Sequence, residues 1–433
     1  MLNSWVPVQP GSDFPIQNLP VGRMRPREGA DRLAVAIGSH AVDVGALAAR
    51  TSREAAELLA APVLNPFLAA GPQAWASVRG WLTELLSQER WRSAVEPHLH
   101  PLAEVDLLLP FEVADYTDFY SSENHATNLG TILRPNEPPL MPNWKHLPVG
   151  YHGRAGTVAV SGTSFRRPRG QRPEPDGPPS FGPCRKLDIE TEVGFVVGVP
   201  SELGTPVPVS GFADHVFGVV LVNDWSARDL QAWEYRPLGP FLAKSFLTSI
   251  SPWVVPLAAL QSARTAPPEG DVPRLPYLQE DSAHPWGLDI DIQVSLNGHV
   301  VSEAPFATTY WTPAQQLAHM TVNGASIRTG DLYASGTVSG PRPGQYGSFM
   351  EMSWNGTRPV TLPDGTKRGF LEDGDVVTLT ASAAGEDGVR IGFGRCEGRV
   401  LPALRQRCAG TARSSQSGPA ASRPWRSGPR WGS

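Results

Sequence analysis

Turn-forming residues divide this sequence into short segments along its whole length. Of its 433 residues, 43 are glycine and 44 are proline. Glycine adopts turn conformations at little cost, and proline interrupts the hydrogen bonding of helices and central strands. We therefore expect many turns and short strands rather than long helices, in a mainly β fold with some helix (α+β).

The charge and the cysteines exclude several classes of protein. The formal net charge is −5 without a basic block, which argues against binding to nucleic acid or to an anionic membrane. Cys184, Cys396 and Cys408 fit neither a disulfide framework nor a cysteine zinc site. The first 20 residues lack a secretory signal, and apolar runs such as residues 216–222 are too short to span a membrane. We expect a cytoplasmic protein.

Several segments carry clear secondary-structure patterns. Residues 33–37 and 41–44 flank a Gly-Ser-His turn and predict a β-hairpin. A helix is expected to begin at Gly71-Pro72, since an apolar stripe with helical spacing follows. The other expected elements are strands at residues 187–197 and 216–222, a helix at 224–235, and a hairpin of residues 348–354 and 357–362.

The end of the chain differs from the rest. Residues 405–433 are rich in Ser, Arg, Gly and Pro, and such a segment buries too little apolar area to offset the entropy of ordering. The sequence therefore predicts a disordered tail.

Truncation after Leu404 should leave the melting temperature and the activity nearly unchanged, because a disordered tail makes few stabilising contacts. Thermal unfolding and turnover of the truncated and full-length chains measure this. A large loss of either quantity on truncation would show that the tail docks.

Three acidic residues alternate with apolar ones in residues 186–195 (KLDIETEVGF). If the segment is a strand, Asp188, Glu190 and Glu192 share one face and the apolar residues share the other. Neighbouring like charges repel, so the acidic face requires water or a cation. From this segment alone, a solvent-facing strand edge and a cation site are equally good interpretations.

Two other segments contain groups that need partners to act. Asp118 and Tyr120 share a face if residues 115–120 are extended, and His125 follows in a polar run. A histidine in such a run is usually a surface or hydrogen-bonded residue. Glu351 lies in the segment interpreted as a strand, where a single glutamate is more often solvated than catalytic.

Residues 223–235 carry polar groups with helical spacing. Asp224, Arg228, Gln231 and Tyr235 fall at i, i+4, i+7 and i+11, on one helix face. N-capping by Asp224, or an ion pair between Asp224 and Arg228, would explain part of the pattern. The aligned groups would also suit an anionic, oxygen-rich ligand. Lys244 follows among apolar and small residues.

Taken together, these segments resemble the fumarylacetoacetase family. The likeness runs from about Trp5 to Pro402. The matching segments are residues 12–20 (SDFPIQNLP), 115–120 (DYTDFY), 125–128 (HATN), 147–154 (LPVGYHGR), 223–229 (NDWSARD) and 335–340 (SGTVSG). The N-terminal match matters most, because the wider superfamily usually lacks this N-terminal domain.

The resemblance implies a fold and an activity. It implies a small N-terminal SH3-like barrel (residues 1–107) and a large C-terminal β-sandwich roll of the fumarylacetoacetase type (residues 108–404), in a homodimer. The implied activity is metal-dependent hydrolysis of fumarylacetoacetate to fumarate and acetoacetate, the last step of tyrosine and phenylalanine breakdown. The alternatives are a hydrolase of the same superfamily that acts on acylpyruvates or other diketo acids, and a metal-binding β protein without catalysis, such as a carbohydrate-binding module.

The resemblance also assigns metal ligands. The residues matching the family's calcium ligands are Asp118, Glu190, Glu192 and Asp224, and this set of oxygen donors suits a hard cation. A magnesium site is implied at Asp224, Lys244 (through its backbone) and Thr248. Leu247 stands where the family usually has glycine.

Catalytic and substrate-binding roles follow from the same resemblance. His125 matches the general base, and Glu351 matches the carboxylate that orients it. The groups implied around the developing oxyanion are Arg228, Gln231 and Lys244. The implied substrate contacts are Tyr120, Arg134, Gln231, Tyr235 and Thr337.

Overall fold

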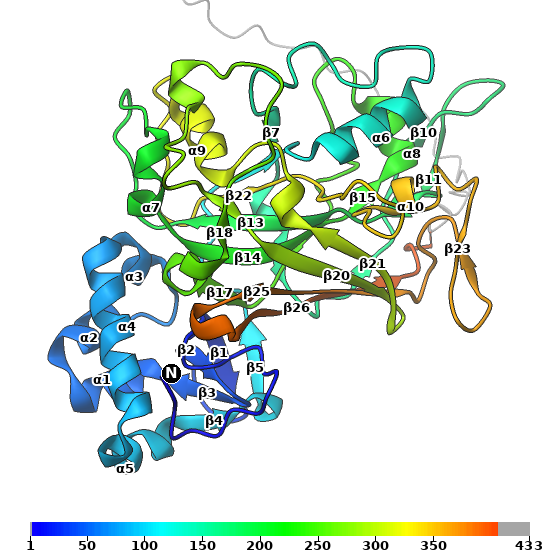
Figure 1. Cartoon of the computed structure of the whole chain (residues 1–433). Coiled ribbons are helices and arrows are strands. Elements are labelled where there is room, and N and C mark those ends of the chain that lie inside the picture. The colour runs from blue at the N-terminus through cyan, green and yellow to red at the C-terminus, as the bar shows by residue number, and fades with distance from the viewer. Residues whose placement is uncertain (1, 406–433) are drawn as a thin grey trace, which may run out of the picture. The chain divides into compact units, whose positions relative to one another are not determined.

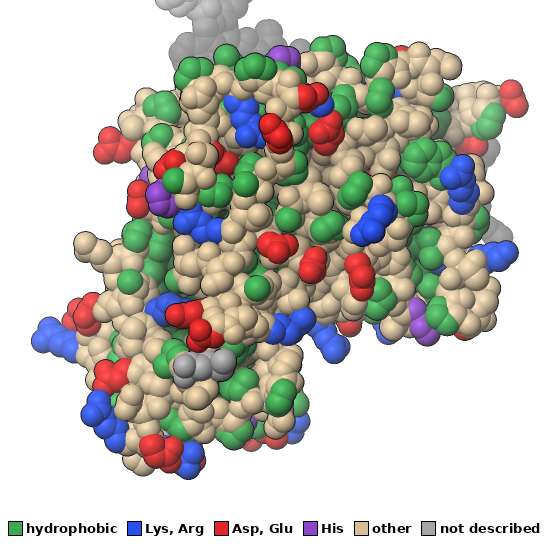
Figure 2. All heavy atoms as spheres, viewed as in Figure 1, with side chains coloured by type: hydrophobic (Ala, Val, Ile, Leu, Met, Phe, Trp, Pro, Cys, Tyr) green, Lys and Arg blue, Asp and Glu red, His purple; other side chains and the backbone are tan. Residues whose placement is uncertain are grey.

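The computed structural model describes residues 2–405 and is mainly β with helices at its periphery, which confirms the expected α+β class (Figure 1). The predicted disorder of the tail falls on residues 406–433, which lie outside the described residues. Between residues 2 and 405, no helix is both long and apolar enough to cross a membrane. On the face drawn in Figure 2, basic and acidic side chains are interspersed.

The largest sheet has 13 strands. They are β1 (Val21–Pro26), β2 (Arg32–Ile37), β3 (His40–Asp43), β4 (Leu99–Pro101), β5 (Val105–Leu108), β6 (Tyr116–Phe119), β7 (Gly150–His152), β8 (Val158–Val160), β13 (Thr191–Val197), β14 (Val216–Asp224), β16 (Thr248–Ile250), β17 (Trp253–Pro256) and β22 (Leu332–Ala334). The main path has the order β4-β3-β2-β1-β17-β14-β13-β22-β6-β7, and β5, β16 and β8 pair beside it. Strands far apart in sequence, such as β6 and β22, therefore become neighbours.

Strand β1 joins the N-terminal strands to the rest of this sheet. It pairs antiparallel with β2 and β5, and Val21 and Gly22 also pair with Val254 and Trp253 of β17. Gly22 is required at this junction, because a Cβ would lie 2.6 Å from the Trp253 ring. β4 pairs with β3, and no pairing between described residues closes the N-terminal strands of the expected SH3-like barrel into a complete ring.

A five-stranded sheet packs against the first one through a shared apolar core. Its order is β21 (His299–Pro305), β20 (Ile290–Leu296), β25 (Val376–Ala384), β26 (Arg390–Leu401) and β9 (Phe165–Arg166). Alternate residues of β20 are buried, as expected for a strand with one face in the core. Ile292 and Val294 of β20 belong to the same apolar cluster as Val219 and Leu221 of β14. The two sheets therefore form the expected sandwich.

Helices and short strand pairs complete the fold. The helices are α1 (Val44–Thr51), α2 (Arg53–Leu58), α3 (Asn65–Ala69), α4 (Gly71–Ser87), α5 (Arg92–Val95), α6 (Glu123–Leu133), α7 (Phe212–His215), α8 (Arg228–Glu234), α9 (Pro313–Thr321) and α10 (Phe349–Met352). The strand pairs are β10 (Arg169–Arg172) with β11 (Ser180–Pro183), β12 (Leu187–Asp188) with β15 (Ser226–Ala227), β18 (Arg264–Thr265) with β19 (Gly287–Leu288), and β23 (Val360–Thr361) with β24 (Lys367–Arg368).

Three predicted elements are confirmed closely. The hairpin at residues 33–44 is β2 and β3, and the buried strand at 216–222 is β14. The helix predicted from Gly71 is α4, with its apolar stripe buried at Val78, Leu82, Leu85 and Leu86. Cys184 and Cys396 are free, in line with the absence of a disulfide framework, and both are buried; Cys408 lies outside the described residues.

Two boundaries near the acidic residues were wrong. The strand predicted over residues 187–197 is interrupted, because β12 ends at Asp188 and β13 begins at Thr191. The helix predicted from Asp224 begins at Arg228, since β14 continues to Asp224 and pairs there with Thr248 of β16. Asp224 therefore lies at a strand end rather than on a helix face with Arg228.

The strand predicted at residues 348–354 was also wrong, because this segment contains the helix α10. Ser348 caps the helix by accepting a hydrogen bond from the Glu351 amide. The Phe349 and Met350 amides donate to the buried carboxylate of Asp188, at 2.6 and 3.0 Å. These contacts satisfy the free amides of the first turn, so tertiary structure overrides the strand-like alternation. The nearest hairpin is β23 with β24, farther along the chain.

Gly130→Ala should destabilise the protein by about 1–3 kcal/mol, because overpacking a filled site has this typical effect. Gly130 lies in α6, and a Cβ there would be 1.9 Å from the Pro139 carbonyl oxygen. Gly80→Ala is the matched control, because Gly80 is exposed in α4 and its Cβ would meet nothing within 4 Å. That variant should gain about 0.5–1 kcal/mol. Urea unfolding measures both, and equal effects would contradict the packing of α6 on Pro139.

Candidate active site

Four buried carboxylates converge where the strands of the large sheet end. Asp118 lies on β6, Glu192 on β13 and Asp224 at the end of β14, while Glu190 immediately precedes β13. The sheet order β14-β13-β22-β6 brings these segments together. One oxygen of each carboxylate lies within 4.8 Å of the others. The interpretation of Glu190 and Glu192 as a solvent-facing strand edge was therefore wrong.

Two cationic side chains neutralise one side of this carboxylate cluster. Lys244 Nζ donates to Glu190 Oε2 at 2.6 Å and to Asp224 Oδ2 at 2.7 Å. Arg228 Nη1 donates to Glu190 Oε1 at 2.7 Å, and Thr248 Oγ1 donates to Asp224 Oδ1 at 2.7 Å. Burial disfavours the Glu190 anion, but Lys244 and Arg228 outweigh burial and hold the pKa of Glu190 well below its ordinary value.

The other side of the cluster lacks positive charge. Asp118 Oδ1 and Glu192 Oε1 are buried and have no hydrogen-bond partner among the described residues. Burial, together with the neighbouring carboxylates, raises the pKa of both Asp118 and Glu192. Unpartnered carboxylate oxygens without any histidine or cysteine form a donor set that fits a hard divalent cation.

His125 and Glu351 form a buried pair beside this cluster. His125 lies in the first turn of α6, which Ser122 caps, and its Nδ1 is 2.7 Å from Glu351 Oε2. Burial alone would raise the pKa of Glu351, but His125 and neighbouring hydrogen-bond donors hold it below its ordinary value. In the neutral imidazole, a hydrogen bond from Nδ1–H to an ionised Glu351 leaves Nε2 as an acceptor. That Nε2 is buried and has no partner among the described residues.

Three polar side chains hold Glu351 in place. Asn128 Nδ2 donates to Oε1 at 2.9 Å, and Oε2 accepts from Ser339 Oγ at 2.9 Å and Ser348 Oγ at 2.7 Å. Sequence reasoning missed these residues. Asn128 follows His125 by one helical turn, so recognising α6 would have found it. Ser339 reaches Glu351 only through the fold.

Tyr120 is close to both the carboxylate cluster and the His125–Glu351 pair. Its ring lies edge-on to the His125 ring, with 5.3 Å between the ring centroids. Burial raises the pKa of Tyr120, and the Glu190 and Glu351 carboxylates raise it further. Its hydroxyl therefore lies in the field of the carboxylate cluster and of the His125–Glu351 pair at once.

Arg228 is held from both sides. Its Nε donates to Asp188 Oδ2 at 2.7 Å, and Nη1 donates to Glu190 and, at 3.1 Å, to Gln231 Oε1. Its Nη2 is buried without a partner in the described part of the chain. Asp188, expected beside Glu190 and Glu192, instead binds Arg228 and the first turn of α10. One buried carboxylate thus positions both the guanidinium and the helix that carries Glu351.

The other predicted substrate contacts have less defined geometry. Arg134 ends α6 and donates to the Pro139 carbonyl at 2.9 Å. Tyr235 is half-buried at the end of α8. Thr337 is buried, and its hydroxyl has no partner among the described residues. Their contacts with a substrate stay predictions. Leu247 is buried in the main apolar cluster, beside a Thr248 that still reaches Asp224.

The sequence matches two family models. The model described as fumarylacetoacetase N-terminal matches residues 17–110, and that described as fumarylacetoacetate (FAA) hydrolase C-terminal matches residues 115–401. Among solved structures, a fumarylacetoacetate hydrolase from Exiguobacterium antarcticum aligns with a TM-score of 0.52 and 16% identity, over 89% of this chain and 99% of that chain. At this identity the structural likeness supports the fold alone.

Full-length relatives are much more similar in sequence. The fumarylacetoacetases of Bos taurus, Homo sapiens and Arabidopsis thaliana are 49%, 47% and 44% identical to this chain, each over 93% of it and 99% of the relative. The two regions matched by the family models also stand in the expected order. The chain therefore belongs to the fumarylacetoacetase family.

Proposed function

We propose that this enzyme hydrolyses a carbon–carbon bond of 4-fumarylacetoacetate to give fumarate and acetoacetate, the last step of tyrosine and phenylalanine breakdown. The buried His125–Glu351 pair, whose Nε2 has no partner among the described residues, together with the cluster of four buried carboxylates, is the observation that carries the proposal. The near full-length similarity to named fumarylacetoacetases supports the same substrate.

We propose that a divalent cation binds the carboxylate cluster. Ca²⁺ is proposed at Asp118, Glu190, Glu192 and Asp224, and Mg²⁺ at Asp224, the Lys244 backbone and Thr248. When bound, such a cation supplies Lewis acidity toward the ketone oxygens of a β-diketone, which favours loss of the acetoacetyl part as an enolate. The unpartnered oxygens of Asp118 and Glu192 support this assignment.

His125 is the proposed general base. With Nδ1–H held by Glu351, its Nε2 takes a proton from water, and the water oxygen attacks the ketone carbon of the fumaryl part. The bond from that carbon to the neighbouring methylene then breaks. The methylene carries the electron pair away and is protonated, while the attacked carbon becomes the second carboxylate of fumarate.

Arg228, Gln231 and Lys244 are proposed to stabilise the tetrahedral oxyanion. The unpartnered Nη2 of Arg228 can donate to it without breaking the bonds that fix the guanidinium. Donors that are held in place before the reaction need no reorganisation when the charge develops. Tyr120, Arg134, Gln231, Tyr235 and Thr337 are proposed to bind the substrate.

Substrate preference distinguishes this proposal from the alternative, a hydrolase of acylpyruvates or other diketo acids. Purified protein should turn over fumarylacetoacetate with a kcat/KM at least about a hundredfold above that for acylpyruvates, because unpaired buried polar groups penalise the wrong substrate. A preference for acylpyruvates would favour the alternative. Absence of turnover on either class would favour a binding protein such as a carbohydrate-binding module.

We further propose a cytoplasmic homodimer with an N-terminal domain at residues 1–107 and a catalytic domain at 108–404. The N-terminal family match ends at residue 110 and the C-terminal match begins at residue 115, which supports a domain boundary near residue 107. Sedimentation of the purified chain tests the dimer.

A further inference from the structure

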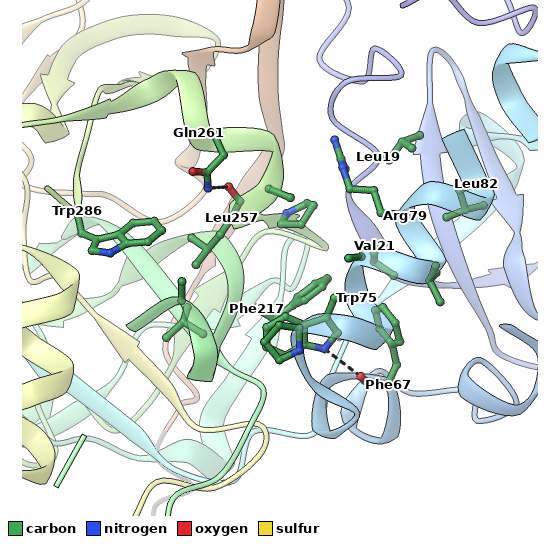
Figure 3. Close-up of a pocket in the computed structure, with 17 residues that line it drawn as sticks. Leu19, Val21, Phe67, Trp75, Arg79, Leu82, Phe217, Leu257, Gln261 and Trp286 are labelled. Carbon is green, nitrogen blue, oxygen red and sulfur yellow. Dashed lines mark hydrogen bonds between the residues drawn. The ribbon is translucent and has the colours of Figure 1, made fainter. Parts of the chain in front are cut away.

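A cavity lies away from the candidate active site, between α4 and the large sheet. Its volume is about 220 Å³. One wall comes from the N-terminal region, and the other comes from β14 and from residues 256–261 with Trp286 (Figure 3). None of the residues assigned to metal, base or substrate lines it.

The cavity has the size and lining for one aromatic ring. Cavities of about 150 Å³ with apolar walls take up benzene, so this volume holds a ring with a short side chain. Figure 3 shows Trp75 and Phe217 at its base, and their rings meet edge to face with 5.3 Å between centroids. Phe67 meets Phe217 in the same manner at 5.6 Å. Aromatic walls of this kind favour an aromatic guest.

One cation interrupts this apolar lining. Arg79 lies on the wall formed by α4, and its Nη1 donates to the Asn18 carbonyl at 2.8 Å while Nη2 donates to the Gln17 carbonyl. These carbonyls hold the guanidinium without cancelling its charge. Burial lowers the pKa of the Arg79 guanidinium, and the charge of Glu386 opposes this to a smaller extent without an ion-pair contact between the two side chains. Its remaining N–H donors and its charge suit a carboxylate.

We propose that this cavity binds a small aromatic monocarboxylate, with the ring beside Phe67, Trp75 and Phe217 and the carboxylate beside Arg79. Such a ligand contacts the N-terminal region and the catalytic sheet at once. Because it binds the folded chain and not the unfolded one, it raises the melting temperature. This site is independent of the proposed reaction.

Calorimetric titration and thermal unfolding with 3-phenylpropionate test the proposal on the full chain. We expect a Kd of about 1 mM or tighter, in line with the efficiency of ligands of this size. The neutral isostere 3-phenylpropanol should bind about tenfold more weakly, because it cannot pair with Arg79. Equal binding of the acid and the alcohol overturns the proposal. So does the absence of binding by the acid at a concentration about tenfold above the expected Kd.

Substitutions on α4 locate the binding. Ala76 lines the cavity, so Ala76→Trp should fill it and abolish binding of 3-phenylpropionate while turnover stays unchanged. Gln73→Trp is the matched control, because Gln73 is exposed on α4 and does not line the cavity. Binding that persists in Ala76→Trp places the ligand elsewhere and overturns the proposal. A change of oligomeric state in Ala76→Trp would identify a second copy as the occupant and would overturn it equally.

Discussion

His125→Ala lowers the turnover of fumarylacetoacetate by about a hundredfold to ten-thousandfold, the usual range for the loss of a general base. The imidazole is 1% exposed and hydrogen-bonded to Glu351, and its Nε2 has no partner among the described residues. Metal binding persists in this variant, since His125 is assigned no metal contact. Steady-state kinetics and metal content measure the two quantities.

His319→Ala is the matched control for this substitution. His319 lies on α9, is partly buried and has its Nδ1 3.1 Å from the Tyr277 hydroxyl. Loss of that contact affects local stability and leaves turnover near the wild-type value. If His125→Ala also kept near-normal turnover, the proposed mechanism would be wrong, whatever the family relationship.

Glu351 extends the same experiment to a pair. Glu351→Gln removes the charge that holds the Nδ1 proton but keeps the imidazole, so it lowers turnover less than His125→Ala does. If Glu351 acts through His125, the double variant is little worse than His125→Ala alone, because the two residues form one unit. Losses that add in free energy would show that Glu351 contributes separately, for example by direct contact with the substrate.

The pattern of apolar residues within a segment was enough to predict those elements whose structure is specified by their own sequence. The apolar run at residues 216–222 and the stripe of α4 specify a buried strand and an amphipathic helix within their own sequence. The segment of α10 is a case in which the pattern within the segment predicts the wrong element. Its alternation of Met350, Met352 and Trp354 fits a strand, but the deciding partner is Asp188, 161 residues away from Phe349. The local sequence of this segment does not predict its contact with Asp188.

The candidate site was only partly predictable for the same reason. Strand alternation grouped Asp188 with Glu190 and Glu192, but the strand is interrupted at residues 189–190, and Asp188 instead binds Arg228 and α10. Membership of Asp118 and Asp224 in the carboxylate cluster depends on the sheet order. The resemblance assigned both residues as metal ligands, whereas periodicity gave no sign of it. His125 and Glu351 are 226 residues apart, so burial and pairing of this histidine followed from no local signal.

Removal of divalent metal abolishes turnover, and added Ca²⁺ or Mg²⁺ restores it. The physical reason is the charge of the cluster. Lys244 and Arg228 neutralise Glu190, whereas Asp118 and Glu192 are left with unpartnered oxygens in a buried setting. A bound cation removes the repulsion among these carboxylates and also stabilises the fold. At a free metal concentration 100-fold above Kd, the gain is about 2.7 kcal/mol, which thermal unfolding detects without reference to activity.

Single substitutions then distinguish the stabilisation that comes from bound metal from the stability of the metal-free fold. Asp118→Asn and Glu192→Gln each remove one charged ligand, so each weakens or abolishes the rise in melting temperature that metal produces. In the absence of metal, both variants are at least as stable as the parent chain, because neutralising an unpaired buried carboxylate relieves desolvation and repulsion. Glu202→Gln is the control, since Glu202 is exposed and keeps the full metal-dependent rise. Full activity in protein shown by elemental analysis to be metal-free would rule out the metal's role. A metal-dependent rise that survived in both cluster variants would instead place the cation elsewhere in the chain.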